Sequence, residues 1–295
     1  MISMDIPLRK LEHTRFALPE LGLGTWQMGG RREADFSKDK EDIAAIKAAI
    51  TAGITHLDTA EVYGAGHTEE LVREGIKGVN RKTLFITSKV KENSRKSRIL
   101  EACEQSLKRL GTGYLDLYLL HHYSTDCPLA ESIEALDELV SKKLVRHIGV
   151  SNFSKEHLKE AQKLTKHKIV CDQVYYNLAS RQPEATGLLD YCQKHGVLLV
   201  AYRPVEKGRL LEGLPPVMGE LCRKYEKTPA QIAINWLISQ PNVVTIFKTS
   251  NAAHLKENLG SLGWNLTEED IERLRKEYPQ NPPPPEGEFV RLSTV

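Results

Sequence analysis

Two kinds of segment alternate along the chain. Short, nearly continuous apolar runs are separated by longer segments in which apolar residues recur every three or four positions. Continuous apolar runs are typical of strands buried on both faces, and the three-to-four spacing is typical of amphipathic helices. The pattern predicts eight strands, which end in the segments 21–26, 56–58, 84–89, 115–121, 145–152, 169–175, 197–202 and 243–248.

Helical patterns fill the gaps between these runs, as in the isoleucine spacing of residues 43–50. Ser154 and Thr267 stand where N-caps are expected, and Thr228, followed by proline and then by Gln231, has the signature of a capping box. Alternation of strand and helix favours a parallel sheet. The fold class predicted is therefore α/β: a (β/α)8 TIM barrel with an N-terminal β-hairpin capping its bottom and short extra C-terminal helices.

The length of 295 residues fits one such barrel, which typically takes about 250 residues. No linker divides the sequence, so residues 1–295 are expected to form a single domain. The one low-complexity stretch lies in the proline-rich tail, residues 279–295. Its composition favours an extended segment. Two interpretations stay open: a disordered terminus, or a flap over the substrate at the barrel mouth.

Composition narrows the class of protein. A net charge of +2 gives no signal for nucleic-acid or membrane partners. The five cysteines are odd in number and lack CxxC spacing, which favours reduced thiols over disulfides or a zinc site. Residues 1–10 contain no long apolar stretch, and no run of about 20 apolar residues follows. We expect a cytoplasmic protein without a metal, a monomer or a weak homo-oligomer.

Four residues with matching chemistry stand about one strand–helix unit apart: Asp58, Tyr63, Lys89 and His121. Each follows or ends a predicted strand, and a βαβ unit takes about 30 residues or more. Parallel barrels carry their chemistry at the carboxyl ends of their strands. These four side chains are therefore expected to meet at the barrel mouth.

Together the four residues make a proton donor. A free tyrosine, with a pKa of about 10, donates poorly at neutral pH, and a nearby cation lowers that pKa. Lys89 is expected to be this cation for Tyr63, and Asp58 supplies the counter-charge that a buried lysine needs. His121 can donate a hydrogen bond to a substrate oxygen. The set predicts proton transfer to a polarised carbonyl.

Two other chemistries fit parts of this set. A Schiff-base aldolase would use Lys89 as its nucleophile, but needs a depressed lysine pKa, and Asp58 pushes the pKa the other way. A metal hydrolase would use His121, His122 and Asp58, but no further His/Asp cluster stands at ligand spacing.

The chain resembles the aldo-keto reductases from about residue 15 to 275. The resemblance rests on the segments 22–26, 58–64, 88–89, 116–121, 148–153 and 201–204, on Gln173, and on Lys248 followed by Glu257 and Asn258. It implies that Asp58, Tyr63, Lys89 and His121 are the catalytic tetrad. Tyr63 would be the general acid when an aldehyde or ketone is reduced and the general base when an alcohol is oxidised.

The resemblance also implies NADP(H), although the chain lacks a GxGxxG fingerprint. Ser151, Asn152 and Gln173 match the residues that hold the nicotinamide carboxamide, and Tyr202 matches the ring that stacks on the nicotinamide. The remaining positions that match cofactor contacts are Arg203, Pro204, Gly208, Leu210, Lys248, Thr249, Ser250, His254, Glu257 and Asn258.

The sequence departs from the family at the cofactor and substrate sites. His254 stands where an arginine commonly clamps the 2′-phosphate, and histidine lacks the bidentate fork, so NAD(H) is expected as a second cofactor beside NADP(H). His122 replaces a common tryptophan in the substrate pocket, which leaves Trp26 as the main apolar wall. One alternative function remains: a nucleotide-sensing regulatory subunit on the same fold, with little turnover.

Overall fold

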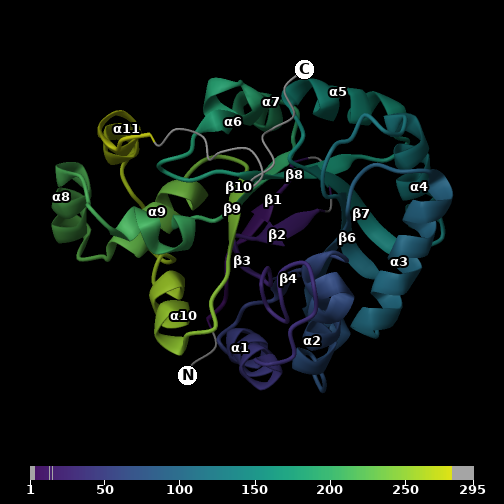
Figure 1. The fold of residues 1–295 in the computed structure, drawn as a ribbon. Coiled ribbons are helices and arrows are strands. Elements are labelled where there is room, and N and C mark those ends of the chain that lie inside the picture. Colours follow the sequence, from purple (N-terminus) through teal and green to yellow (C-terminus); the bar gives the residue numbers. More distant parts are fainter. Residues whose placement is uncertain (1–3, 13, 15, 281–295) are drawn as a thin grey trace.

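Eight parallel strands close into a barrel in the computed structural model, which describes residues 4–280 apart from residues 13 and 15 (Figure 1). The hydrogen-bonded order is β10-β3-β4-β5-β6-β7-β8-β9. The strands are β3 (Leu21–Gly24), β4 (His56–Asp58), β5 (Phe85–Val90), β6 (Leu115–Leu120), β7 (Val145–Ser151), β8 (Ile169–Tyr175), β9 (Leu198–Tyr202) and β10 (Val243–Phe247). The prediction of a (β/α)8 barrel with eight strands in these segments is confirmed.

Helices surround the barrel on its outside (Figure 1). They are α1 (Asp39–Thr51), α2 (His67–Gly75), α3 (Lys96–Leu110), α4 (Leu129–Ser141), α5 (Lys155–Leu164), α6 (Gln182–Ala185), α7 (Leu188–Lys194), α8 (Pro216–Tyr225), α9 (Pro229–Ile238), α10 (Ala252–Leu259) and α11 (Glu268–Glu277), with short 3-10 turns η1 (Tyr63–Gly66), η2 (Arg81–Thr83) and η3 (Glu206–Leu211). Within the described part of the chain, none of these helices is long and apolar enough to cross a membrane.

The predicted caps account for several helix boundaries. Ser154 accepts a hydrogen bond from the backbone of His157 and begins α5, and Thr267 does the same with Asp270 at α11. Thr228 forms the complete capping box at α9. These side chains satisfy backbone N–H groups that have no partner within the helix. The sequence therefore encodes the starts of these helices locally.

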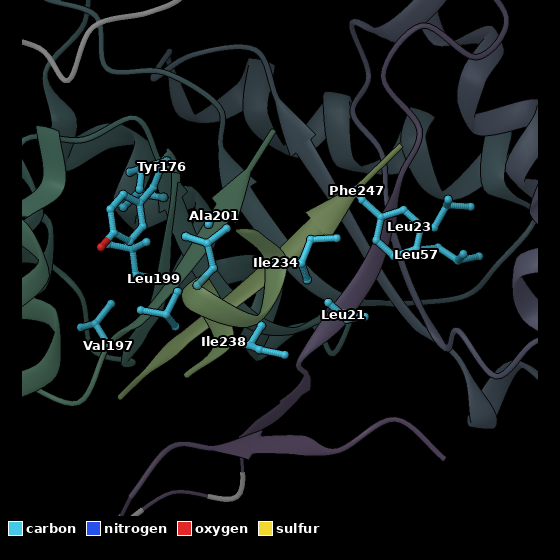
Figure 2. Packing of buried hydrophobic residues seen from close by; sticks show 14 of the residues in the cluster. Leu21, Leu23, Leu57, Tyr176, Val197, Leu199, Ala201, Ile234, Ile238 and Phe247 are labelled. Carbon is cyan, nitrogen blue, oxygen red and sulfur yellow. The ribbon is translucent and has the colours of Figure 1, made fainter. Parts of the chain in front are cut away.

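The main hydrophobic core lies between the barrel and the helices. Apolar side chains on the outward faces of the strands pack against the inward faces of the helices. Figure 2 shows part of this layer, where two isoleucines of α9 lie against side chains of β3, β9 and β10: Ile234, Ile238, Leu21, Leu199 and Phe247. Burial on both faces explains why the strands read as continuous apolar runs.

A second core fills the barrel interior and includes the N-terminal hairpin. Strands β1 (Leu8–Lys10) and β2 (Ala17–Pro19) pair antiparallel. Leu11, Phe16 and Leu18 of this hairpin pack with inward side chains of β6, β8, β9 and β10. Since Glu20 leads directly into β3, the hairpin covers the amino ends of the strands. The predicted hairpin cap of the barrel bottom is confirmed, and chemistry is left to the opposite end.

Helix α11 follows the last strand–helix unit and packs against α8. Lys224 of α8 bonds to Asp270 of α11 at 2.6 Å, and the Tyr225 hydroxyl donates to the same carboxylate at 2.5 Å. Helix α11 is an extra C-terminal helix of the kind expected from the sequence. Of the predicted tail, residues 281–295 lie outside the described residues.

Candidate active site

The four predicted catalytic side chains meet at the carboxyl ends of neighbouring strands. Asp58 ends β4, Lys89 lies near the end of β5, and His121 directly follows β6. Tyr63 begins the turn η1 after β4. Lys89 Nζ donates to Asp58 Oδ1 at 2.6 Å and lies 3.4 Å from the Tyr63 hydroxyl, which is 3.5 Å from His121 Nε2. The structure thus brings all four together.

Lys89 is completely buried and well compensated. Its ammonium bonds to the Asp58 carboxylate and, at 2.8 Å, to the Thr59 backbone carbonyl. Burial favours the neutral amine, but the charge of Asp58 and the contact with Tyr63 outweigh it, and the pKa of Lys89 is raised above its usual value. A Schiff-base lysine requires the opposite shift, so this environment disfavours the aldolase alternative.

The pKa of Tyr63 corrects one sequence expectation. Lys89 does lower this pKa, as expected, but burial of the phenol raises it by more, so the net shift is upward. A buried phenolate loses its hydration, and one cation at 3.4 Å does not replace it. Tyr63 therefore holds its proton at neutral pH, which is the state that a general acid needs.

His121 is held as a neutral imidazole. Burial lowers its pKa well below the usual value, and His122 and Lys89 add to the effect. His122 stacks on His121 with ring centroids 4.4 Å apart, and its own pKa is lowered to about 4, mainly by burial. Of the two rings, His121 bonds to Tyr63 and His122 bonds to the Asn152 side chain at 3.2 Å. His121 is therefore the histidine that faces Tyr63.

The indole of Trp26 lies beside the Tyr63 phenol. The rings of Trp26 and Tyr63 meet edge to face, with centroids 4.8 Å apart. The tryptophan is half-buried, so part of its surface is open at the mouth. This position agrees with the expected apolar pocket wall, and His122 is a polar neighbour stacked on His121.

The residues expected to hold the carboxamide form one bonded group. Ser151 Oγ donates to the Gln173 backbone carbonyl at 2.7 Å, and Tyr202 donates its hydroxyl to Asn152 Oδ1 at 2.9 Å. Asn152 Nδ2 also bonds to the backbone carbonyl of His121 at 3.1 Å. The structure therefore places this group directly against the tetrad.

Gln173 makes a contact that sequence reasoning missed. Its Nε2 donates to Asp58 Oδ2 at 2.8 Å, across the barrel from one strand to another. The two oxygens of Asp58 are thus divided between Lys89 and Gln173. No local sequence pattern predicts this hydrogen bond, because its partners are 115 residues apart.

The segment after β9 contains unusual backbone. Arg203, Glu206 and Lys207 all have left-handed φ angles, of 60°, 46° and 56°. Arg203 lies 4.0 Å from the Glu206 carboxylate, which also accepts from the Tyr175 hydroxyl. Pro204 follows Arg203 directly, and Gly208 and Leu210 continue in η3, with the Leu210 carbonyl bonded to Tyr278. Strained loops of this kind cluster at binding sites.

The residues expected at the adenosine end lie before and along α10: Lys248, Thr249 and Ser250 precede the helix, His254 is in its first turn, and Glu257 and Asn258 are in its last turn. Lys248 follows β10 and is exposed, as are Ser250 and His254, whereas Thr249 and Asn258 are buried. Glu257 contributes its backbone carbonyl to a 3.1 Å bond with Gln231. The structure thus brings the predicted phosphate-binding residues to one helix start.

A hollow of about 320 Å³ separates this helix start from α1. Residues 249–252 line one side, and Glu41 and several alanines of α1 line the other. Glu41 was not among the predicted site residues, because an acidic residue near a helix start reads as an ordinary favourable charge on the helix dipole. Within residues 4–280, positions 13 and 15 aside, no group of three or more His, Cys, Asp or Glu is placed to hold a metal ion.

The chain belongs to the aldo/keto reductase family, whose model matches residues 20–278. It is 35% identical over 267 residues to methylglyoxal reductase YeaE of Escherichia coli (strain K12), covering 89% of this chain and 92% of that protein.

Two solved structures share the fold. The thermostable aldo-keto reductase Tm1743, in complex with the inhibitor epalrestat, superposes with a TM-score of 0.89 at 44% identity, over 92% of this chain and 99% of that one. An aldo/keto reductase from Klebsiella pneumoniae in complex with NADP and acetate gives a TM-score of 0.80 at 37% identity, over 90% and 93% of the two chains.

Proposed function

We propose that this protein is an NADP(H)-dependent oxidoreductase that reduces small aldehydes and ketones to alcohols, or runs the reverse reaction, with Tyr63 as general acid and base. The arrangement of Lys89, paired with Asp58 at 2.6 Å and lying 3.4 Å from the Tyr63 hydroxyl, is the observation that carries this proposal. Reductases act on small carbonyls among its relatives, including methylglyoxal reductase of Escherichia coli.

Each tetrad residue has a distinct task in this proposal. Tyr63 keeps its proton until a substrate oxygen approaches, because burial raises its pKa. Lys89 remains cationic and stabilises the phenolate left after proton transfer. Neutral His121 orients the substrate oxygen towards Tyr63 through its Nε2 atom. Asp58 keeps Lys89 charged and fixed in place.

The donor set at the mouth fits a nicotinamide dinucleotide. The side chains of Ser151, Asn152 and Gln173 offer hydroxyl and amide groups that match a carboxamide, and the ring of Tyr202 is partly exposed beside them. Lys248 at the start of α10 suits a 2′-phosphate. When bound, this cofactor supplies or accepts the hydride, and the residues named here bind and orient it.

Tyr63→Phe tests the proposal. The variant keeps the ring and loses the hydroxyl, so reduction of methylglyoxal should fall to near background while NADPH affinity, followed by tryptophan fluorescence, stays within about twofold. Trp26→Tyr is a useful comparison, because it alters the aromatic wall packed against Tyr63 but keeps the Tyr63 hydroxyl. Retained turnover in Tyr63→Phe would exclude Tyr63 as the acid. Tight NADPH binding by the wild type without turnover on any carbonyl would favour the nucleotide-sensing alternative.

A cytosolic location belongs to the same proposal. All five cysteines are free, and three of them are buried, which suits a reducing compartment. The remaining part of the proposal is a small-molecule carbonyl or alcohol as the partner, with the protein acting as a monomer or weak homo-oligomer.

A further inference from the structure

A buried carboxylate outside the tetrad joins the elements that carry the tyrosine and the lysine. Glu69, the third residue of α2, has no exposed surface. Its Oε1 accepts from Ser88 Oγ at 2.6 Å, and its Oε2 accepts from Arg109 Nε at 2.7 Å. Ser88 immediately precedes Lys89 in β5, and Arg109 lies in α3. One side chain thus ties together α2, β5 and α3.

Arg109 also supports the turn that presents Tyr63. The three residues after Tyr63 have left-handed φ angles: 52° at Gly64, 52° at Ala65 and 97° at Gly66. At Ala65 this conformation costs about 1–2 kcal/mol. A Cβ atom at Gly66 would lie only 2.8 Å from the Cδ and Nε atoms of Arg109, so the arginine packs directly against the turn. Strained backbone persists where its surroundings hold it, and Arg109 is part of those surroundings.

The position of this turn determines the contact between the Tyr63 hydroxyl and the Lys89 ammonium, which is a long one. Lys89 Nζ is 3.4 Å from the Tyr63 hydroxyl, beyond the usual range of about 2.7–3.2 Å for a strong hydrogen bond. Lys89 itself is fixed by Asp58 and by the Thr59 carbonyl. A small movement of Tyr63 therefore decides how strongly the ammonium stabilises the phenolate.

We propose that Glu69 is a positioning residue for catalysis: through Ser88 and Arg109 it sets the separation between Tyr63 and Lys89. This inference rests on the proposed reductase function. A buried ion pair contributes little net stability compared with apolar packing, but its hydrogen bonds fix geometry. Here the fixed geometry is the position of η1, which carries Tyr63, relative to β5, which carries Lys89.

The chain offers a matched control in the neighbouring strand β6, at the amino end of the barrel. Asp116 is also a buried carboxylate, and it binds two arginines, Arg81 at 2.7 Å and Arg146 at 2.9 Å. It also accepts from the backbone N–H of Ile86 in β5 at 2.9 Å. Asp116 therefore resembles Glu69 in burial, charge pairing and attachment to β5, but lies at the amino end of the strands, away from the site.

The experiment compares Glu69→Gln with Asp116→Asn. Both variants should melt at a lower temperature than the wild type. Glu69→Gln should lower kcat for methylglyoxal reduction by about tenfold, while Kd for NADPH and KM for the carbonyl stay within about twofold. Asp116→Asn should leave kcat within about twofold. Ser88→Ala, which keeps the Glu69–Arg109 pair, should show a smaller loss of kcat than Glu69→Gln.

A crystal structure of Glu69→Gln adds a readout that does not depend on turnover. The distance from Lys89 Nζ to the Tyr63 hydroxyl should lengthen, and an unchanged distance overturns the inference even if the wild type proves inactive. Equal effects of Glu69→Gln and Asp116→Asn on kcat would also overturn it. Failure of the wild type to bind NADPH would instead refute the proposed function, so the two failures are distinguishable.

Discussion

Gln173 and Asp58 are joined by a hydrogen bond of 2.8 Å from the Gln173 amide to the carboxylate oxygen that Lys89 does not use. One partner belongs to the expected nicotinamide site and the other to the proposed catalytic tetrad. The two sites therefore share a hydrogen-bonded chain that runs from Gln173 through Asp58 to Lys89.

The first prediction concerns this bond. Gln173→Leu removes the donor and leaves Asp58 Oδ2 buried without it, which should lower the free energy of unfolding by about 1.5–3 kcal/mol. It should also lower kcat, because Asp58 is no longer held in place beside Lys89. Gln162→Leu is the control, since Gln162 accepts from Tyr191 at 2.6 Å on the helical surface, far along the chain from the tetrad. Chemical denaturation and steady-state kinetics measure the two effects.

The second prediction is the pH dependence of the two reaction directions. Reduction needs a protonated Tyr63, and burial raises the pKa of this residue above its ordinary value of about 10. The kcat for reduction should therefore show no alkaline decline below about pH 10. Oxidation needs the phenolate, so its kcat should rise with pH over the same range. A decline in kcat for reduction with a midpoint near pH 8 in the wild type would contradict this assignment.

The third prediction concerns acid stability. His56 is buried in β4 beside Thr87, and burial lowers its pKa from 6.5 to about 4. Between about pH 6.5 and pH 4, His56 is therefore protonated in the unfolded chain but neutral in the folded chain. The free energy of unfolding decreases as the pH falls through this range. A shift of this size corresponds to about 3 kcal/mol.

His56→Gln should make this part of the stability–pH profile less steep, as measured by urea unfolding at several pH values, and the remaining slope belongs to His121 and His122, whose pKa values are also lowered. A slope unchanged in His56→Gln would assign the acid sensitivity to another group.

The fourth prediction concerns cofactor selectivity. Lys248→Met should weaken NADPH binding by about tenfold or more and NADH binding by less than about threefold, because only NADPH carries the 2′-phosphate. Lys256 is exposed like Lys248 but lies within α10, so Lys256→Met is the matched control for loss of one positive charge. Glu41→Lys should act in the opposite sense and tighten NADPH, since Glu41 lines the hollow beside residues 249–252. Equal changes for both nucleotides would place these residues away from the 2′-phosphate.

Much of the fold and the central part of the site could be predicted from the sequence, for a physical reason. Strand and helix periodicity and the caps at Ser154, Thr228 and Thr267 are local signals. The tetrad positions follow because residues at successive strand ends of a parallel barrel converge. Local chemistry also indicated the pairing of Lys89 with Asp58.

What sequence reasoning missed depends on three-dimensional burial and on long-range contacts. The sign of the Tyr63 pKa shift was wrong, because the balance between burial and one cation requires knowing both. Glu69 reads as an ordinary helix residue, and only the structure shows that it lies between Ser88 and Arg109. Glu41 became a candidate cofactor-site residue only because the structure shows that it lines the hollow between α1 and α10.

The closure of the barrel has a consequence for biosynthesis. Strand β10, near the end of the chain, pairs with β3, near its beginning, with Thr245 opposite Leu21. Asp58, Lys89 and His121 are therefore synthesised long before the strand that completes the ring around them. Until that strand leaves the ribosome, β3 and β9 each present an unpaired edge, which is the kind of surface that invites aggregation. Loss of the last strand should thus threaten solubility of the newborn chain before it affects catalysis.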